Sequence, residues 1–227
     1  MNVLVIGASR GIGLECVRQH LAAGDRVIAT ARDDAGLERL RAMGAVALKL
    51  DVTNPASVSG LTRQLDGEKL DLALYVAGVL SEEGAKSPPT QQAFDAMVHA
   101  NVLGAMQALP QVAPCVEEAG GQFAFVTSDM GQIGGTTASR AWVYHVSKAA
   151  LNMAVVAAQP DYPRAQFLLI HPGWVQTEMG TAAATLTVDQ SVTAMRQTLA
   201  ARKTTQTPYA SQDVPYLHWD GRPFSSW

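Results

Sequence analysis

The sequence has little cysteine, few histidines and no long apolar run. Its 227 residues include two cysteines, Cys16 and Cys115, which lie far apart in apolar helical patterns, so we expect free thiols. The five histidines form no HxxxH pair and no cysteine–histidine cluster, which gives a metal site little support. The apolar stretch VLVI breaks at Gly7, too soon for a signal or membrane segment. We therefore expect a cytoplasmic protein without a metal.

Charge of either sign is also scarce. Charged residues make up 16% of the chain, and 17 Lys and Arg against 20 Asp and Glu leave a net charge of −3. This balance argues against nucleic acid or an acidic membrane as a partner held by bulk charge. Hydrophobic residues make up 48%, which is typical of a compact domain. We expect one domain over residues 1–227.

Short apolar runs alternate with longer helical patterns along the whole chain. Their nearly continuous Val, Ile, Leu, Ala and Phe content predicts strands that are covered on both faces, as in a parallel sheet. The alternation predicts right-handed crossovers and a doubly wound α/β sheet flanked by helices, the Rossmann fold. The predicted strands are 3–6, 26–30, 46–50, 70–76, 122–127 and 166–170. The predicted helices are 12–23, 34–43, 55–65, 91–118, 140–158 and 188–201, with Pro110 and Pro114 kinking or ending the fourth.

A glycine-rich turn, GASRGIG, joins the first predicted strand to the first predicted helix. Glycines allow a tight turn and a close backbone approach to a pyrophosphate, and the helix N-terminus offers free N–H groups. Because the turn has a strand before it and a helix after it, we expect it to bind a dinucleotide. The residues expected to do so are Gly7, Ser9, Arg10, Gly11, Ile12 and Gly13.

The end of the second predicted strand indicates which dinucleotide is bound. NAD sites usually place a carboxylate there for the ribose 2′-hydroxyl, whereas this chain has Arg32. With Arg10 nearby, two guanidinium groups would pair with a 2′-phosphate, which favours NADP(H) over NAD(H). Asp33 and Asp34 follow Arg32 directly, and these carboxylates could cap the next helix instead of binding the ribose. After the third strand, Asp51 is either a helix cap or an acceptor for the adenine amino group, and Val52 would lie against the ring.

Seven motifs in a fixed order resemble the short-chain dehydrogenase/reductase family over nearly the whole chain. They are GASRGIG, LDVT at 50–53, VAG at 76–78, ANVLG at 100–104, VTSDMG at 126–131, YHVSK at 144–148 and HPGWVQTEMG at 171–180. The chain looks most like the sniffer/C-factor branch, whose reductases act on carbonyls. The resemblance implies an NADPH-dependent reduction of a small carbonyl substrate, reversible with the alcohol.

The resemblance also implies a catalytic set. Tyr144 is the acid/base that protonates the carbonyl oxygen, Lys148 lowers the pKa of Tyr144, Ser128 bonds the substrate oxygen, and Asn101 holds a water near Lys148. Positions 144 and 148 share one helical face. An ammonium about 4 Å from the phenol, at an effective dielectric of about 20, lowers its pKa by up to about 3. Rival hydroxyls are Thr127 and Ser139.

Further expectations follow from the same resemblance. Loops 79–90, 131–140 and 178–187 would line the substrate cleft, the last as a mobile lid. The usual paired asparagines before Ala77 are replaced by Tyr75 and Val76, and a usual threonine is Ile6. The remaining residues expected at the cofactor are Ala77, Gly78, Pro172, Gly173, Val175 and Thr177, together with Asn101, Tyr144 and Lys148.

Helix 140–158 is apolar nearly all round, so it is either wholly buried or meets a second copy of the chain in a homodimer. His171 is interpreted as a packed histidine at a strand end. A regulator that binds NADP without turnover is the alternative function. A lyase or epimerase on the same fold usually needs a longer chain.

Overall fold

The protein folds around one parallel sheet of seven strands, in a computed structural model that describes residues 1–203 and 207–227. The strand order is β3-β2-β1-β4-β5-β6-β7, so the order reverses between β1 and β4 as in a doubly wound sheet. The predicted fold class is thereby confirmed. The strands are β1 (Asn2–Ile6), β2 (Arg26–Ala31), β3 (Val46–Lys49), β4 (Leu72–Tyr75), β5 (Gln122–Val126), β6 (Gln166–His171) and β7 (Tyr216–His218).

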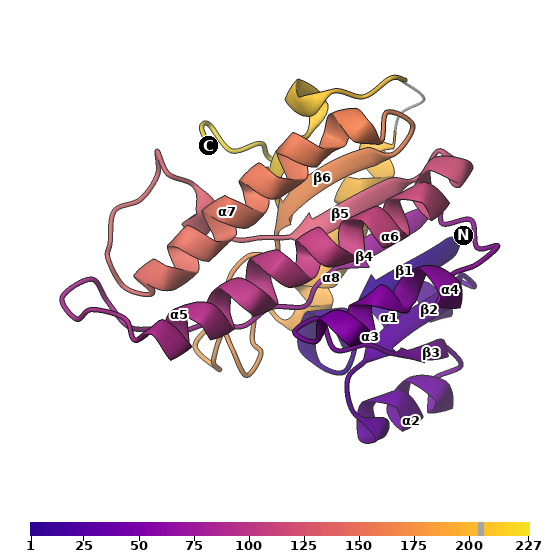
Figure 1. Ribbon diagram of the computed structural model, residues 1–227, viewed down its shortest axis with the longest axis horizontal. Coiled ribbons are helices and arrows are strands. Elements are labelled where there is room, and N and C mark those ends of the chain that lie inside the picture. The colour runs from indigo at the N-terminus through magenta and orange to yellow at the C-terminus, as the bar shows by residue number, and fades with distance from the viewer. Residues whose placement is uncertain (204–206) are drawn as a thin grey trace.

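Helices cover both faces of the sheet, and α6 and α7 cross its near face in Figure 1. Along β1, Val3 and Val5 belong to one hydrophobic core while Leu4 and Ile6 belong to the other, because strand side chains alternate between faces. The first core packs under α1, α2 and α8, and the second under α3, α4, α6 and α7. The α-helices are α1 (Gly11–Ala22), α2 (Asp34–Ala42), α3 (Pro55–Ser59), α4 (Leu61–Gln64), α5 (Gln91–Val98), α6 (Gly104–Ala119), α7 (Trp142–Ala158) and α8 (Val188–Arg202). The short helices are η1 (His99–Leu103), η2 (Asp129–Gly131), η3 (Gln159–Asp161) and η4 (Ser211–Asp213).

The helix predicted at 91–118 is interrupted, but at a different place from the one expected. A π-helical turn, η1, separates α5 from α6. Neither Pro110 nor Pro114 ends α6, which continues to Ala119. Both prolines are exposed and one turn apart, so the carbonyl groups that lose their helical partners lie on the solvent side. The helix predicted at 55–65 is likewise divided at Gly60 into α3 and α4.

Strand β7 was not predicted, because three residues are too few for a pattern. It pairs parallel with β6 and continues into an aromatic segment that folds back over it. The Tyr216 ring stacks on Phe224 with centroids 3.9 Å apart and on Trp227 at 5.7 Å. The aromatic segment therefore packs against β7.

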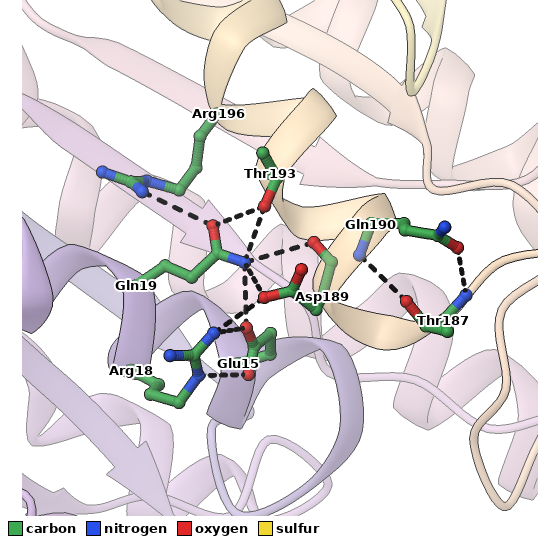
Figure 2. Close-up of polar contacts among 8 residues, drawn as sticks. All are labelled: Glu15, Arg18, Gln19, Thr187, Asp189, Gln190, Thr193 and Arg196. Carbon is green, nitrogen blue, oxygen red and sulfur yellow. Dashed lines mark hydrogen bonds and ion pairs between the residues drawn. The ribbon is translucent and has the colours of Figure 1, made fainter.

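A polar network joins α1 to α8 (Figure 2). The buried Gln19 side chain donates to Glu15 at 2.8 Å and to Thr193 at 3.0 Å, while Arg18 bonds Asp189 at 2.8 Å. Thr187 begins α8 with a capping box. The network therefore fixes the helix that follows loop 178–187. Within the described part of the chain, no helix combines the length and apolarity that crossing a membrane requires.

Candidate active site

A cleft of about 690 Å³ lies at the carboxyl ends of the strands, on both sides of the point where the strand order reverses. Sheets of this kind bind ligands at this place. Fifteen of the residues predicted for the site line the cleft: Gly7, Ser9, Arg10, Gly11, Ile12, Gly13, Arg32, Asp51, Val52, Ala77, Gly78, Tyr144, Lys148, Pro172 and Thr177. The other four, Asn101, Ser128, Gly173 and Val175, lie outside this lining.

The glycine-rich turn is tight for a steric reason. A Cβ atom on Gly7, whose φ is +87°, would lie 2.7 Å from the Ala77 nitrogen, and one on Gly13 would lie 2.1 Å from the Gly7 oxygen. Sequence analysis missed Thr30, whose hydroxyl on β2 accepts from the Gly7 N–H at 3.1 Å. Ile6 lacks a hydroxyl, so Thr30 on the neighbouring strand β2 supplies the hydroxyl that bonds the turn.

The turn and its surroundings fit a phosphate group. Among the described residues, no side chain caps the N-terminus of α1, so its first N–H groups remain available to an anion. Arg10 and Arg32 both line the cleft. Arg39, which sequence analysis missed, also lines it and donates to the Ser9 carbonyl at 2.6 Å.

The two carboxylates beyond Arg32 have other partners. Asp33 caps α2 by accepting from the Gly36 N–H at 2.8 Å, and Asp34 pairs with Lys49 at 2.9 Å. Asp51 is not a helix cap, because Asn54 caps α3. The Asp51 carboxylate accepts from both the N–H and the hydroxyl of Thr53, which lowers its pKa.

Tyr144 and Lys148 lie on the buried face of α7, with the Lys148 ammonium 5.6 Å from the centre of the Tyr144 ring. The prediction that the pKa of the Tyr144 phenol is lowered is wrong for the protein alone. Burial raises the pKa of Tyr144, and the Ser128 hydroxyl beside it only partly opposes the shift. Burial also lowers the pKa of Lys148 to about 8, and its ammonium donates to the Val126 carbonyl at 3.0 Å. In the protein alone, burial is the largest effect on the pKa of each of the two groups.

Asn101 sits at the centre of η1, where the α-helical pattern breaks, and its side chain is fully buried. Its Nδ2 donates to Val79 O at 2.9 Å and to Ser147 Oγ at 2.9 Å, and its Oδ1 accepts from Val79 N at 2.8 Å. The amide therefore ties loop 79–90 to α7. Tyr75, in place of an amide, stacks on Phe125 and donates to the carbonyl of Ala100 in η1 at 3.4 Å.

Ser128 follows β5 and caps η2, and its hydroxyl accepts from Met130 N at 3.1 Å. The phenol of Tyr216, another residue that sequence analysis missed, donates to the Ser128 carbonyl. Of the rival hydroxyls, that of Thr127 is buried and bonded to Asn152 at 2.6 Å, and Ser139 is exposed. Ser128 is therefore the hydroxyl that the structure places beside Tyr144.

Contacts with other parts of the fold hold each of the three loops that we expect to line the substrate cleft. In the loop after β6, Val175 bridges to Leu186, and Glu178 forms an ion pair with Arg10 of the glycine-rich turn. In loop 131–140, Arg140 pairs with Glu82 at 2.5 Å, which ties this loop to loop 79–90. Its other end is held by the segment after β7, where Gln132 donates to Ser226 Oγ at 2.9 Å.

The fold and the cleft together define a dinucleotide-binding oxidoreductase. The chain belongs to the short-chain dehydrogenase/reductase family, because the family described as short chain dehydrogenase matches residues 1–186. The 1-hydroxy-2-glutathionyl-2-methyl-3-butene dehydrogenase of Rhodococcus sp. (strain AD45) is 34% identical over 184 residues, which cover 78% of this chain and 79% of that protein.

Solved structures agree with this assignment. A protein from Burkholderia multivorans, described as a short-chain dehydrogenase/reductase with bound NADP, is 26% identical with a TM-score of 0.89, covering 100% of this chain and 99% of that one. The carbonyl reductase Sniffer of D. melanogaster is 24% identical with a TM-score of 0.86 over 100% and 99% of the two chains, and shares the fold.

Proposed function

We propose that the protein reduces the carbonyl group of a small molecule with NADPH, reversibly with the alcohol, and that Tyr144 supplies the proton. One observation carries the proposal. A phenol and an ammonium from one face of α7 open into the same cleft as the glycine-rich turn. A bound nicotinamide cofactor supplies the hydride in such chemistry.

The remaining steps belong to the chain's own residues. Tyr144 donates its proton to the carbonyl oxygen, and Ser128 fixes that oxygen by a hydrogen bond. Lys148 holds the ribose hydroxyls, and its charge favours the phenolate that forms when Tyr144 has given up its proton. The positive charge of oxidised nicotinamide adds to that of Lys148. Asn101 keeps loop 79–90 and α7 at a fixed separation around this group, and its place in η1 supports the proposed link to a water near Lys148.

NADPH is proposed over NADH on the basis of charge at the end of β2. Three guanidinium groups, those of Arg10, Arg32 and Arg39, line this part of the cleft. Asp33, the carboxylate nearest to the place where NAD enzymes hold the ribose, already caps α2. Asp33 also lines this part of the cleft, so a bare 2′-hydroxyl would find one carboxylate there, whereas a 2′-phosphate would find three cationic partners.

The test compares Tyr144→Phe with wild type on a panel of aldehydes, ketones and quinones, following the oxidation of NADPH. We expect at least a hundredfold loss of turnover with unchanged NADPH binding, since acid/base catalysis typically contributes that much. Tyr162→Phe, which removes a half-buried phenol just beyond the far end of α7, is the matched control. Near-normal turnover in Tyr144→Phe would refute the assignment.

The alternative is a regulator that binds NADP without turnover. Such a protein has no need for a buried ammonium, and burial lowers the pKa of Lys148 to about 8, which is a cost to stability. The retained Tyr144–Lys148 pair therefore favours an enzyme. NADPH binding without turnover of any compound in the panel would favour the regulator.

We also propose that two copies form a homodimer through α6 and α7. These helices lie side by side on one face of the sheet (Figure 1). Met106 of α6 and Val146 and Met153 of α7 are exposed by 52%, 51% and 67%. Helix α7 is thus buried only on one side, and a second copy would bury the apolar residues of the other side.

We also propose a cytoplasmic location, because the free thiols Cys16 and Cys115 fit the reducing conditions of the cytoplasm.

A further inference from the structure

Ser128, whose hydroxyl is proposed to bond the substrate oxygen, is held through its backbone carbonyl. This carbonyl accepts two hydrogen bonds, one from the Gly131 N–H at 2.9 Å and one from the phenol of Tyr216. The first bond closes the short helix η2, and the second joins η2 to strand β7, 88 residues further along the chain. Together the two bonds fix the orientation of the peptide group that follows Ser128.

The Tyr216 side chain is itself held firmly in place. It is buried, and its ring stacks on Phe224, with centroids 3.9 Å apart and planes 17° apart, and on Trp227 at 5.7 Å. The Phe224 N–H also donates to the Tyr216 carbonyl at 2.9 Å. Burial raises the pKa of Tyr216, so the phenol keeps its proton near neutral pH and remains a hydrogen-bond donor.

Helix η2 also packs directly on α7, the helix that carries Tyr144. A Cβ atom on Gly131 would lie 2.9 Å from Asn152 Nδ2, so the approach of η2 to α7 is too close for a larger residue. The Asn152 amide donates to the Gly131 carbonyl at 3.4 Å. Contacts with α7 and with β7 therefore both act on η2, and the place of Ser128 relative to Tyr144 depends on the two together.

We propose that Tyr216 is a positioning residue, which fixes through the Ser128 carbonyl the place from which the Ser128 hydroxyl bonds the substrate oxygen. This inference rests on the proposed function of Ser128 and Tyr144. The Ser128 Oγ accepts from the Met130 N–H at 3.1 Å, so its place is set by η2, while the hydroxyl proton is free to rotate toward the substrate. Because this hydrogen bond strengthens as charge develops on the substrate oxygen, a displaced Ser128 should lower kcat more than it raises KM.

The test is a double-mutant cycle of Tyr216→Phe and Ser128→Ala. Single turnovers of NADPH are followed with the most reactive carbonyl compound of the panel above, because slow variants stay measurable in this way. Tyr216→Phe keeps the stacked ring, so we expect it to fold. Its rate at saturating substrate should fall about tenfold, with less than about a threefold change in half-saturation, since a misplacement of about 1 Å costs about a hundredfold. In the Ser128→Ala background the same substitution should change the rate less than about twofold, because the hydroxyl that it positions is already absent.

Tyr162→Phe is the matched control, since it removes a half-buried phenol just beyond the far end of α7 and should leave the rates unchanged. If Tyr216→Phe folds poorly, Phe224→Leu takes its place in the cycle, because it removes the stacked ring and keeps the phenol.

Two results would overturn the inference while loss of turnover in Tyr144→Phe upheld the proposed function. One is an equal effect of Tyr216→Phe with and without the Ser128 hydroxyl, which would mean that Tyr216 acts by another route. The other is a normal rate in Tyr216→Phe or in Ser128→Ala. If wild type turns over nothing in the panel, the proposed function fails and the inference fails with it.

Discussion

Replacing Lys148 with methionine should abolish turnover and at the same time stabilise the fold. The ammonium is buried, and its pKa falls from 10.5 to about 8 because it has lost its water. A shift of this size corresponds to about 3 kcal/mol at pH 7. Methionine loses the hydrogen bond to the Val126 carbonyl, which costs about 1 kcal/mol. The expected net gain in the free energy of unfolding is about 2 kcal/mol without added dinucleotide.

The pH dependence distinguishes this cause from a general packing effect. Below about pH 8 both the folded and the unfolded chain carry the proton on Lys148, so the full cost of burying the charge is present. As pH rises from 8 toward 10.5, the folded protein loses this proton first and the cost shrinks. The advantage of Lys148→Met should therefore shrink by about 2 kcal/mol between pH 7 and pH 10.

Urea unfolding at pH 7 and at pH 10 measures both quantities, with Lys69→Met as the control at an exposed lysine. Turnover of NADPH on the same samples should fall below detection for Lys148→Met. A variant that is less stable than wild type at pH 7, or equally favoured at both pH values, would contradict the assignment of a desolvated ammonium.

Two further predictions concern the cofactor and the assembly. Arg39→Gln should lower the preference for NADPH over NADH in kcat/KM by about tenfold or more, since a charged hydrogen bond contributes about 1.5–3 kcal/mol. Arg63→Gln on α4 is the control. An unchanged cofactor preference in Arg39→Gln would show that Arg39 does not contact the 2′-phosphate. Met153→Glu should convert the dimer to a monomer in sedimentation equilibrium, because it places a charge in the proposed α6–α7 interface; a wild-type monomer would dismiss that interface.

The sequence predicted the fold and most of the cleft lining, because both depend on local patterns. Glycines at a strand–helix junction and apolar runs of strand length are visible in any short window. The contacts of Arg39 and Thr30 with the glycine-rich turn cannot be seen in a short window, because they join residues that only the folded chain brings together. The prediction of a lowered pKa for Tyr144 was wrong for a related reason. A spacing of four residues gives the distance to Lys148, but not the burial that decides which form of each group is favoured.

Loop 131–140 is anchored at both ends, by the hydrogen bond of Gln132 to Ser226 and by the ion pair of Arg140 with Glu82. Residues 135–139, between the two anchors, are exposed. If this loop lines the substrate cleft, as we propose, its exposed middle can vary in sequence without loss of either anchoring contact. Substitutions at residues 135–139 should then change which substrates are accepted and leave the fold of the loop intact.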